Sequence, residues 1–272
     1  MAKIKLQSQD EIAETLLTAL YQRANEASRP DALLCDETAR RLIDQIDYDF
    51  NRFTLNKMDQ VNTILRVRQF DRFAQDFLTR HPSSVVINLG CGLDTRFERV
   101  DNGLVEWYNL DLPEVIEFRC KLMVETPRCV SLGYSIFDQA WVKQVGYHPT
   151  KSYLFIAEGV FPYFTEEQVK SLFLLFMHEF PGCELVCDGM SPLMVRIHNL
   201  ELSRSKVTAR LGWALKNGRQ PESWAGGIRL LSDWYYFDRP EARLGIYQLM
   251  RYVPPLAKGV GIYHYQLGNP AD

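Results

Sequence analysis

Residues 83–111 combine three features that together restrict the fold: an apolar run, a turn with two glycines, and an acidic residue at the end of a second apolar run. The first run, residues 85–89, suits a strand that is buried on both faces, as parallel sheets require. Gly90 and Gly92 then allow a tight turn that a ligand can approach closely, because neither residue carries a Cβ atom. This order is typical of an α/β protein that binds a ligand beside the turn.

The second apolar run, residues 105–110, ends at Asp111. That position lies about 20 residues after the turn, where a carboxylate can accept hydrogen bonds from two ribose hydroxyls. Leu112 follows directly and is counted with Asp111 among the predicted binding residues. A tight strand-helix turn of an ordinary α/β protein is the alternative, but Asp111 and the flanking runs favour a nucleoside site.

The turn argues against a nicotinamide dinucleotide, because the third glycine of the GxGxxG pattern is replaced by Thr95. In that pattern the helix beyond the turn holds a pyrophosphate at its N-terminus. Here Asp94 places a carboxylate close to where this anion would lie. S-adenosylmethionine carries a sulfonium and an ammonium beside its adenosine and has no phosphate. We therefore expect this adenosyl ligand, and a nicotinamide-dependent oxidoreductase is disfavoured.

Several segments resemble the leucine carboxyl methyltransferase family, and most closely its bacterial branch of polyketide-type, tetracenomycin-like O-methyltransferases. They read NLGCGLDTR, WYNLDLPEVIEFR and LFIAEGVFPYF. The resemblance runs from residues 15–34 to the HYQLG segment near the C-terminus, nearly the whole chain. It implies a class I methyltransferase fold, S-adenosylmethionine as the methyl donor, and transfer of the methyl group to a substrate oxygen.

The expected fold class is therefore α/β, a Rossmann-like doubly wound sheet with an N-terminal helical cap and an inserted helical lid. Helical spacing predicts a first helix after a capping box at Ser8, a second near residues 36–46, and a third near residues 56–79. Strands are expected near residues 85–89, 105–110, 129–133, 153–157 and 184–187. One domain is predicted, made of a cap (1–82), a cofactor-binding core (83–190), a lid or substrate region (191–238) and a C-terminal completion of the core (239–272).

The lid is predicted from Ser191-Pro192, a typical helix start, and from Asn217-Gly218, a typical stop. A long helix, with or without a break, is expected between them. Arg204 falls on its apolar face, either with a packed stem and a solvated head or as an anchor for an anionic acceptor. The aromatic residues 234–237 either belong to the core or shape a pocket for a planar substrate.

Other candidate donor-binding residues follow from the resemblance. Arg66 matches a family arginine that pairs with the methionine carboxylate of the donor, a role that suits a bidentate guanidinium and that Arg68 could take instead. Glu158 closes the predicted fourth strand, where a carboxylate can meet the ammonium of the donor or the acceptor, and Gly159 gives close access to the backbone.

The adenine ring is expected beside residues 135–137. Many family members carry an acidic residue near the position of Ser135, which this chain lacks, so Asp138 is either the adenine contact or a helix N-cap. The candidate cofactor-binding residues are Arg66, Gly90, Cys91, Gly92, Asp94, Asp111, Leu112, Ser135, Ile136, Phe137, Asp138, Glu158 and Gly159.

A methyl group on a sulfonium is already electrophilic, so the task of the protein is mainly placement of the acceptor. A carboxylate acceptor is ionised at neutral pH, whereas a phenol with a pKa of about 10 needs a base. No strong base stands out, which favours a carboxyl or acidic phenol acceptor. Tyr163, His198 and Arg204 are the weak catalytic candidates.

A small-molecule acceptor is the expected partner, and two alternatives stay open: a methyltransferase for protein C-terminal carboxyls, and a nucleoside-binding protein without turnover. The net charge of -3 predicts neither nucleic-acid nor membrane-surface binding, and a cytoplasmic protein is expected. The six cysteines form no CxxC pair and the histidines no HExxH pattern, so free thiols and no catalytic metal are predicted. Cys91 lies in a turn of the kind that can lower a thiol pKa.

Overall fold

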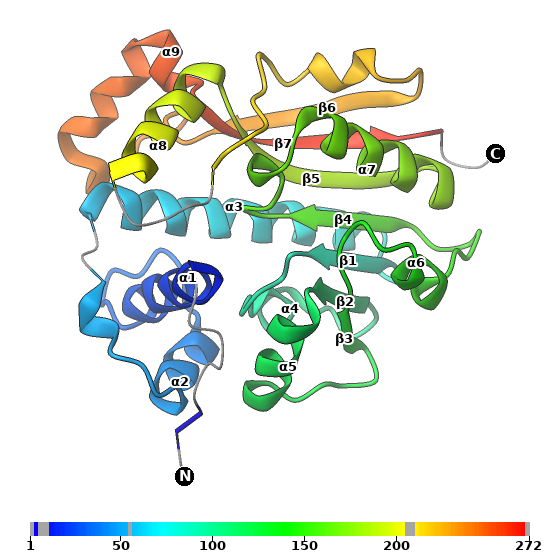
Figure 1. Cartoon of the computed structure of the whole chain (residues 1–272), viewed down its shortest axis with the longest axis horizontal. Helices are drawn as coiled ribbons and strands as arrows, with labels where there is room; N and C mark the ends of the chain where they lie inside the picture. Colours follow the sequence, from blue (N-terminus) through cyan, green and yellow to red (C-terminus); the bar gives the residue numbers. More distant parts are fainter. Residues whose placement is uncertain (1–2, 5–10, 54–55, 205–209, 270–272) are drawn as a thin grey trace.

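The computed structural model describes residues 3–4, 11–53, 56–204 and 210–269. Within these residues the chain forms a seven-stranded sheet in the order β3-β2-β1-β4-β5-β7-β6, with helices on both faces (Figure 1). Five strands are parallel: β1 (Val85–Leu89), β2 (Glu106–Asp111), β3 (Cys129–Gly133), β4 (Tyr153–Ala157) and β5 (Cys183–Met190). All five were predicted from the sequence, although β5 is longer at both ends.

The other two strands, β6 (Ile228–Tyr235) and β7 (Val260–Leu267), complete the sheet beyond β5. β7 pairs antiparallel with both β5 and β6. The sequence analysis placed β6 inside the lid region and missed it as a strand. The cause is local, because β6 is an edge strand with several exposed residues and a register shift between Leu230 and Ser232, which breaks the alternation that marks a strand.

Three helices precede the sheet, as expected: α1 (Glu11–Ala27), α2 (Glu37–Gln45) and α3 (Lys57–Arg80). Asp36 caps α2 through the amide of Ala39, and Asn56 caps α3 through the amide of Met58. Ser8, the start of the predicted capping box, lies outside the described residues. The remaining helices and 3-10 turns are η1 (Phe50–Arg52), α4 (Arg96–Val100), α5 (Pro113–Leu122), α6 (Ala140–Val145), η2 (Phe161–Tyr163), α7 (Glu166–Glu179), α8 (Pro192–Arg204), η3 (Gln220–Ser223), η4 (Ala242–Tyr252) and α9 (Pro254–Ala257).

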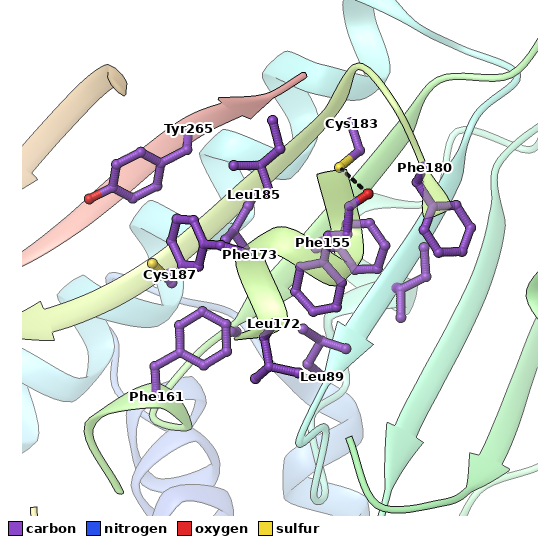
Figure 2. Close-up of a cluster of buried hydrophobic side chains, with 14 of the residues drawn as sticks. Leu89, Phe155, Phe161, Leu172, Phe173, Phe180, Cys183, Leu185, Cys187 and Tyr265 are labelled. Atoms are coloured by element: carbon purple, nitrogen blue, oxygen red, sulfur yellow. Dashed lines mark hydrogen bonds between the residues drawn. The ribbon is translucent and has the colours of Figure 1, made fainter. Parts of the chain in front are cut away.

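The two faces of the sheet have separate cores. On one face, α3 packs its buried residues, Phe70 among them, against Val86 of β1 and Ile156 of β4. On the other face, α6 and α7 cover an aromatic cluster in which Phe155 and Phe176 stack at 4.2 Å (Figure 2). Cys183 and Cys187, predicted as small core residues, lie in this second cluster.

Phe161 extends the aromatic cluster to the carboxyl end of β4, with its ring centroid 6.1 Å from that of Phe173 (Figure 2). It is the first residue of η2, the turn that follows β4. Burial of Phe161 therefore fixes this turn beside the glycine turn that follows β1. The core thus positions the edge of the sheet at which a ligand was predicted.

The region beyond β5 differs from the predicted long helix. α8 begins after Ser191, whose hydroxyl accepts a hydrogen bond from the Met194 amide, and its described part ends at Arg204. The chain is described again from residue 210, and residues 210–215 are not helical. Asn199 of α8 holds this segment by bonding both the amide and the carbonyl of Leu211. No helix in the described ranges is both long and apolar enough to cross a membrane.

Candidate donor-binding site

The chain leaves β1 and β4 in opposite directions along the sheet, although the two strands are neighbours. In doubly wound sheets a ligand binds at the carboxyl ends of the strands at such a point. The residues that follow the two strands adjoin each other here. A Cβ atom added to Gly90 after β1 would lie 2.5 Å from Cγ2 of Val160 after β4. The predicted glycine turn and the predicted Glu158-Gly159 corner therefore lie side by side at the carboxyl ends of β1 and β4.

The glycine turn depends on both of its glycines. Gly90 and Gly92 have φ angles of 58° and 48°, a region that favours glycine. A Cβ atom on Gly92 would lie 2.5 Å from Cδ2 of Leu16, so α1 of the N-terminal cap covers the turn. Cys91 between them is buried, and burial raises its thiol pKa, the opposite of the lowering considered for this turn.

Replacing Gly90 by alanine is expected to destabilise the protein more than the same change at Gly103. Both glycines have positive φ, which costs an alanine about 1–2 kcal/mol, but a Cβ atom at Gly103 meets nothing within 4 Å. Crowding against Val160 adds roughly 1–3 kcal/mol at Gly90. Urea unfolding of the two variants measures the difference, and equal losses would show that Val160 does not crowd the turn.

Asp111 closes β2 and reaches the glycine turn, a contact that the sequence analysis did not predict. Its Oδ2 accepts the amide of Gly92 at 2.7 Å, and its Oδ1 accepts the amide of Leu112 at 2.7 Å. Burial raises the pKa of this carboxyl, while the two amides lower it. Each carboxylate oxygen can accept a further hydrogen bond. The carboxylate is therefore held by the turn and still able to bind two ribose hydroxyls.

Arg66 and Glu158, 92 residues apart in the sequence, form an ion pair. Arg66 Nε donates to Glu158 Oε1 at 3.0 Å, and Arg66 NH1 lies 3.5 Å from Asp188 Oδ2. The amide of Gly159 donates to both oxygens of Asp188. The predicted residues Arg66, Glu158 and Gly159 thus come together with Asp188. The sequence analysis missed Asp188, although an acidic residue after the apolar run of β5 is the signal that marked Asp111 and Glu158.

A fully buried arginine, Arg96, also binds Glu158, through the carboxylate oxygen other than the one that Arg66 binds. Its three nitrogens bind Asp71 Oδ1 at 2.7 Å, Asp94 Oδ2 at 2.5 Å and Glu158 Oε2 at 2.5 Å. Burial would raise the pKa of Asp94, but Arg96 and Arg99 outweigh it and hold the pKa below its usual range. Asp94 therefore faces arginine side chains, and its predicted role toward a cationic ligand stays a prediction.

The segment expected to border adenine, residues 134–139, joins β3 to α6. The Ser135 hydroxyl accepts the amide of Phe137, and Asp138 Oδ1 accepts the amide of Ala140 at the start of α6. Asp138 thus contacts the first residue of α6, but the N-cap of this helix is Gln139, so the alternative N-cap role of Asp138 was wrong. Ile136 packs against the aromatic core, and the Phe137 ring lies edge-on to Phe164, the residue that follows η2, at 4.9 Å.

The three weak catalytic candidates lie in different surroundings. Tyr163 is the last residue of η2, and burial raises its pKa while the nearby Arg66 lowers it. His198 lies on α8 with Nδ1 3.9 Å from Glu201 Oε2. The Arg204 side chain lies outside what the structure describes. Tyr236, another residue that the sequence analysis missed as a site candidate, is buried after β6, where burial raises its pKa and the nearby Arg66 lowers it.

These residues fit an adenosyl donor. The glycine cradle leaves no room for a Cβ atom, and the carboxylate of Asp111 faces it. Asn62, one helical turn before Arg66 on α3, has a buried Oδ1 atom with no hydrogen-bond partner among the described residues. A ligand ammonium would satisfy such an acceptor. In the described part of the chain, no group of three or more His, Cys, Asp or Glu side chains is arranged to hold a metal ion.

Neither of two cavities in the described part of the chain is lined by residues 90–92 of the glycine turn, although Arg119 in the second donates to the Gly92 carbonyl. One, of about 420 Å³, is lined by β6, β7, Lys258 and the 215–219 loop. Another, of about 90 Å³, lies beside Phe97, Arg119 and Cys129. The candidate donor site lies at the strand ends beneath Leu16 of the cap.

The doubly wound sheet with its reversed β7, together with the glycine turn and Asp111 at the switch point, defines a class I S-adenosylmethionine-dependent methyltransferase. Residues 16–177 match the model for leucine carboxyl methyltransferase, and the chain belongs to this family. The predicted fold class, methyl donor and enzyme class are thereby confirmed.

Two curated relatives cover most of the chain. The tetracenomycin polyketide synthesis O-methyltransferase TcmP of Streptomyces glaucescens is 33% identical over 84% of each chain. The S-adenosyl-L-methionine-dependent methyltransferase dpfgK of Gibberella zeae is 27% identical over 86% of this chain and 85% of its own. Among solved structures, magnesium protoporphyrin IX methyltransferase of Synechocystis, with bound S-adenosylhomocysteine, shares the fold at a TM-score of 0.50 and 10% identity, covering 85% of this chain and 93% of its own.

Proposed function

We propose that the protein transfers the methyl group of S-adenosylmethionine to an oxygen of a small molecule, either a carboxylate or an acidic phenol. The similarity to the tetracenomycin polyketide synthesis O-methyltransferase supports a polyketide-like acceptor. A cytoplasmic location and the division into cap, core, lid and C-terminal completion are parts of the same proposal.

One observation carries the choice of acceptor: the carboxylates at the carboxyl ends of β4 and β5 are both engaged by arginine. Glu158 binds Arg66 and Arg96, and Asp188 lies against Arg66. Burial raises the pKa of Asp188 to about 6, but this carboxylate is still a much weaker base than the phenolate of a phenol with a pKa of about 10, and both of its oxygens already accept the Gly159 amide. Burial raises the phenol pKa values of Tyr163 and Tyr236 as well, so both are protonated at neutral pH. An acceptor that arrives ionised needs no base.

The bound donor supplies an electrophilic methyl group on a sulfonium. The residues of the chain bind this donor and orient it toward the acceptor. Asp111 and the glycine turn hold the nucleoside end, Arg66 and Glu158 hold the amino-acid end, and Leu16 of the cap covers the turn against water. In-line placement in a closed site lowers a barrier of this kind by roughly 7–11 kcal/mol.

The test is methyl transfer from isotopically labelled S-adenosylmethionine to three acceptor pools, followed by mild alkali. The pools are aromatic carboxylic acids, phenols without a carboxyl group, and peptides that end in leucine. Methyl esters release label in alkali, whereas aryl methyl ethers keep it. We expect transfer to the small acids with alkali-labile label, or to the most acidic phenols with stable label.

The other outcomes separate the alternatives. Label on the peptides alone would favour a protein C-terminal carboxyl methyltransferase. Binding of S-adenosylhomocysteine without transfer to any pool would favour a nucleoside-binding protein without turnover. Transfer only to weakly acidic phenols would contradict the proposal, because it would require a base among groups that are paired or protonated.

A further inference from the structure

Asp188 occupies a position that costs a carboxylate free energy. It lies near the carboxyl end of β5, and its side chain is 6% exposed. Burial raises its pKa to about 6, although Arg66 and the Gly159 amide lower it. Buried carboxylates weaken a fold unless their partners offset the loss of solvation. Carboxyls perturbed in this way concentrate at functional sites, so the contacts of Asp188 are informative.

The contacts of Asp188 join two parts of the donor site. Both of its oxygens accept the Gly159 amide, at 2.9 and 3.0 Å, and Oδ2 lies 3.5 Å from Arg66 NH1. Gly159 has a φ angle of 69°, so this amide belongs to the sharp corner that follows Glu158. The Asp188 carboxylate therefore holds the Gly159 corner by hydrogen bonds and also attracts the Arg66 guanidinium.

Arg66 is consequently held from two sides. Glu158 takes its Nε and Asp188 attracts NH1, so the two carboxylates define the plane of the guanidinium. A guanidinium carries five N–H groups in a fixed plane. The remaining N–H groups can bind an anionic group of a ligand in the direction that this plane sets. Without Asp188, the guanidinium would keep its hydrogen bond to Glu158 but lose its second carboxylate.

We propose that Asp188 is a positioning residue that orients the Arg66 guanidinium for binding the amino-acid end of the methyl donor. The proposal depends on the methyl donor and not on which acceptor is methylated. This role differs from a purely structural one because Asp188 acts through Arg66 on the binding of one ligand.

The chain offers a matched control on the same strand. Glu184 lies four residues earlier on β5, so its side chain is on the same face of the sheet. It is also a buried carboxylate in ion pairs, with Arg80 at 2.7 Å and His264 at 2.6 Å. Its partners lie toward the opposite edge of the sheet, away from the glycine turn. Glu184→Gln thus removes a comparable buried charge without touching the donor site.

The test compares Asp188→Asn with Glu184→Gln by calorimetric titration with S-adenosylhomocysteine. We expect Asp188→Asn to bind about 10-fold more weakly, the equivalent of one weakened charged hydrogen bond. Glu184→Gln is expected to lose thermal stability but to keep the affinity of the wild type. In the Arg66→Gln background, Asp188→Asn should have little further effect, because the two residues act through one guanidinium.

The pH dependence of the affinity for S-adenosylhomocysteine separates positioning from a purely structural role, which would not change it. The groups that face Asp188 are Arg66 on α3, Glu158 after β4, Tyr163 in η2 and Tyr236 after β6. The charged form of Asp188 is present above pH 6 and is lost as the pH falls through this value. Affinity of the wild type and of Glu184→Gln should therefore weaken between pH 7 and pH 5, whereas Asp188→Asn should not show this change.

Three results would overturn the proposal: wild-type affinity in Asp188→Asn, equal losses of affinity in Asp188→Asn and Glu184→Gln, or additive losses with Arg66→Gln. Asp188→Ser, which keeps an oxygen for the Gly159 amide, is the second variant if the asparagine variant does not fold. Loss of folding in both would assign Asp188 to the folded structure and also overturn its role at the donor site.

Discussion

Replacement of Arg96 by leucine is expected to lower the free energy of unfolding by about 3–5 kcal/mol, the usual cost of breaking a buried ion pair from one side. The guanidinium is fully buried and binds Asp71, Asp94 and Glu158. Its removal leaves three carboxylates with less compensating charge in a site shielded from water. Stability of ordinary domains is only about 5–15 kcal/mol, so much of the variant should be unfolded on mild heating.

The measurement is urea unfolding of Arg96→Leu beside Arg40→Leu. Arg40 forms an exposed ion pair with Glu37 three residues away on α2, and such pairs contribute about 0–1 kcal/mol. Arg96→Lys should be intermediate, since a lysine keeps the charge but cannot reach three carboxylates with a planar fork. A small effect at Arg96, equal to that at Arg40, would show that the buried network does not stabilise the fold.

The large expected effect arises because Arg96 belongs to a wider network. Arg99 binds both Asp71 and Asp36, and Asp36 also binds Arg23 of α1. The network therefore links the N-terminal cap, α3 and the glycine turn to Glu158 at the donor site. Damage to it should loosen the cap over the turn as well as the sheet edge.

The sequence predicted those parts of the fold whose signals are local. The strands β1 to β5 are apolar runs bounded by turn residues, and the glycine turn with Asp111 follows one spacing rule, so each could be found without tertiary information. β6 could not, because an exposed edge strand with a register shift at Leu231 lacks both alternation and an apolar run. The extended segment from residue 210 depends on Asn199 and on a hydrogen bond from Gly212 to Pro162, contacts that no periodicity reveals.

For the candidate donor site, too, some residues were predicted from the sequence and others were missed. Arg66 was assigned through a family resemblance, and the structure brings it to Glu158 across 92 residues. Asp188 and Tyr236 were missed because their importance comes from contact with Arg66, which the sequence does not display. Asp94 was interpreted from its position in the turn alone, whereas Arg96 two residues later pairs with it in the fold. Local spacing therefore indicated the candidate site, and its charge pairing had to be seen in three dimensions.

Replacement of Asp111 by asparagine is expected to weaken binding of S-adenosylhomocysteine by roughly 100-fold, about 2.7 kcal/mol, because charged hydrogen bonds to two ribose hydroxyls are lost or weakened. Asp111 also shapes the turn, since its Oδ2 accepts the Gly92 amide and its Oδ1 the Leu112 amide. Asparagine keeps one acceptor oxygen, which limits damage to the turn.

Calorimetric titration with two ligands separates the direct from the indirect effect of Asp111. An analogue of S-adenosylhomocysteine that lacks both ribose hydroxyls should bind the wild type and Asp111→Asn with nearly equal, weak affinity. Asp101→Asn is the matched control, because Asp101 likewise accepts a backbone amide, that of Gly103, in a loop after α4. It should bind S-adenosylhomocysteine as the wild type does, and NAD should bind none of the three. If Asp111→Asn instead lost affinity equally for both adenosyl ligands, Asp111 would act by shaping the glycine turn, and the ribose contact predicted from its spacing would be wrong.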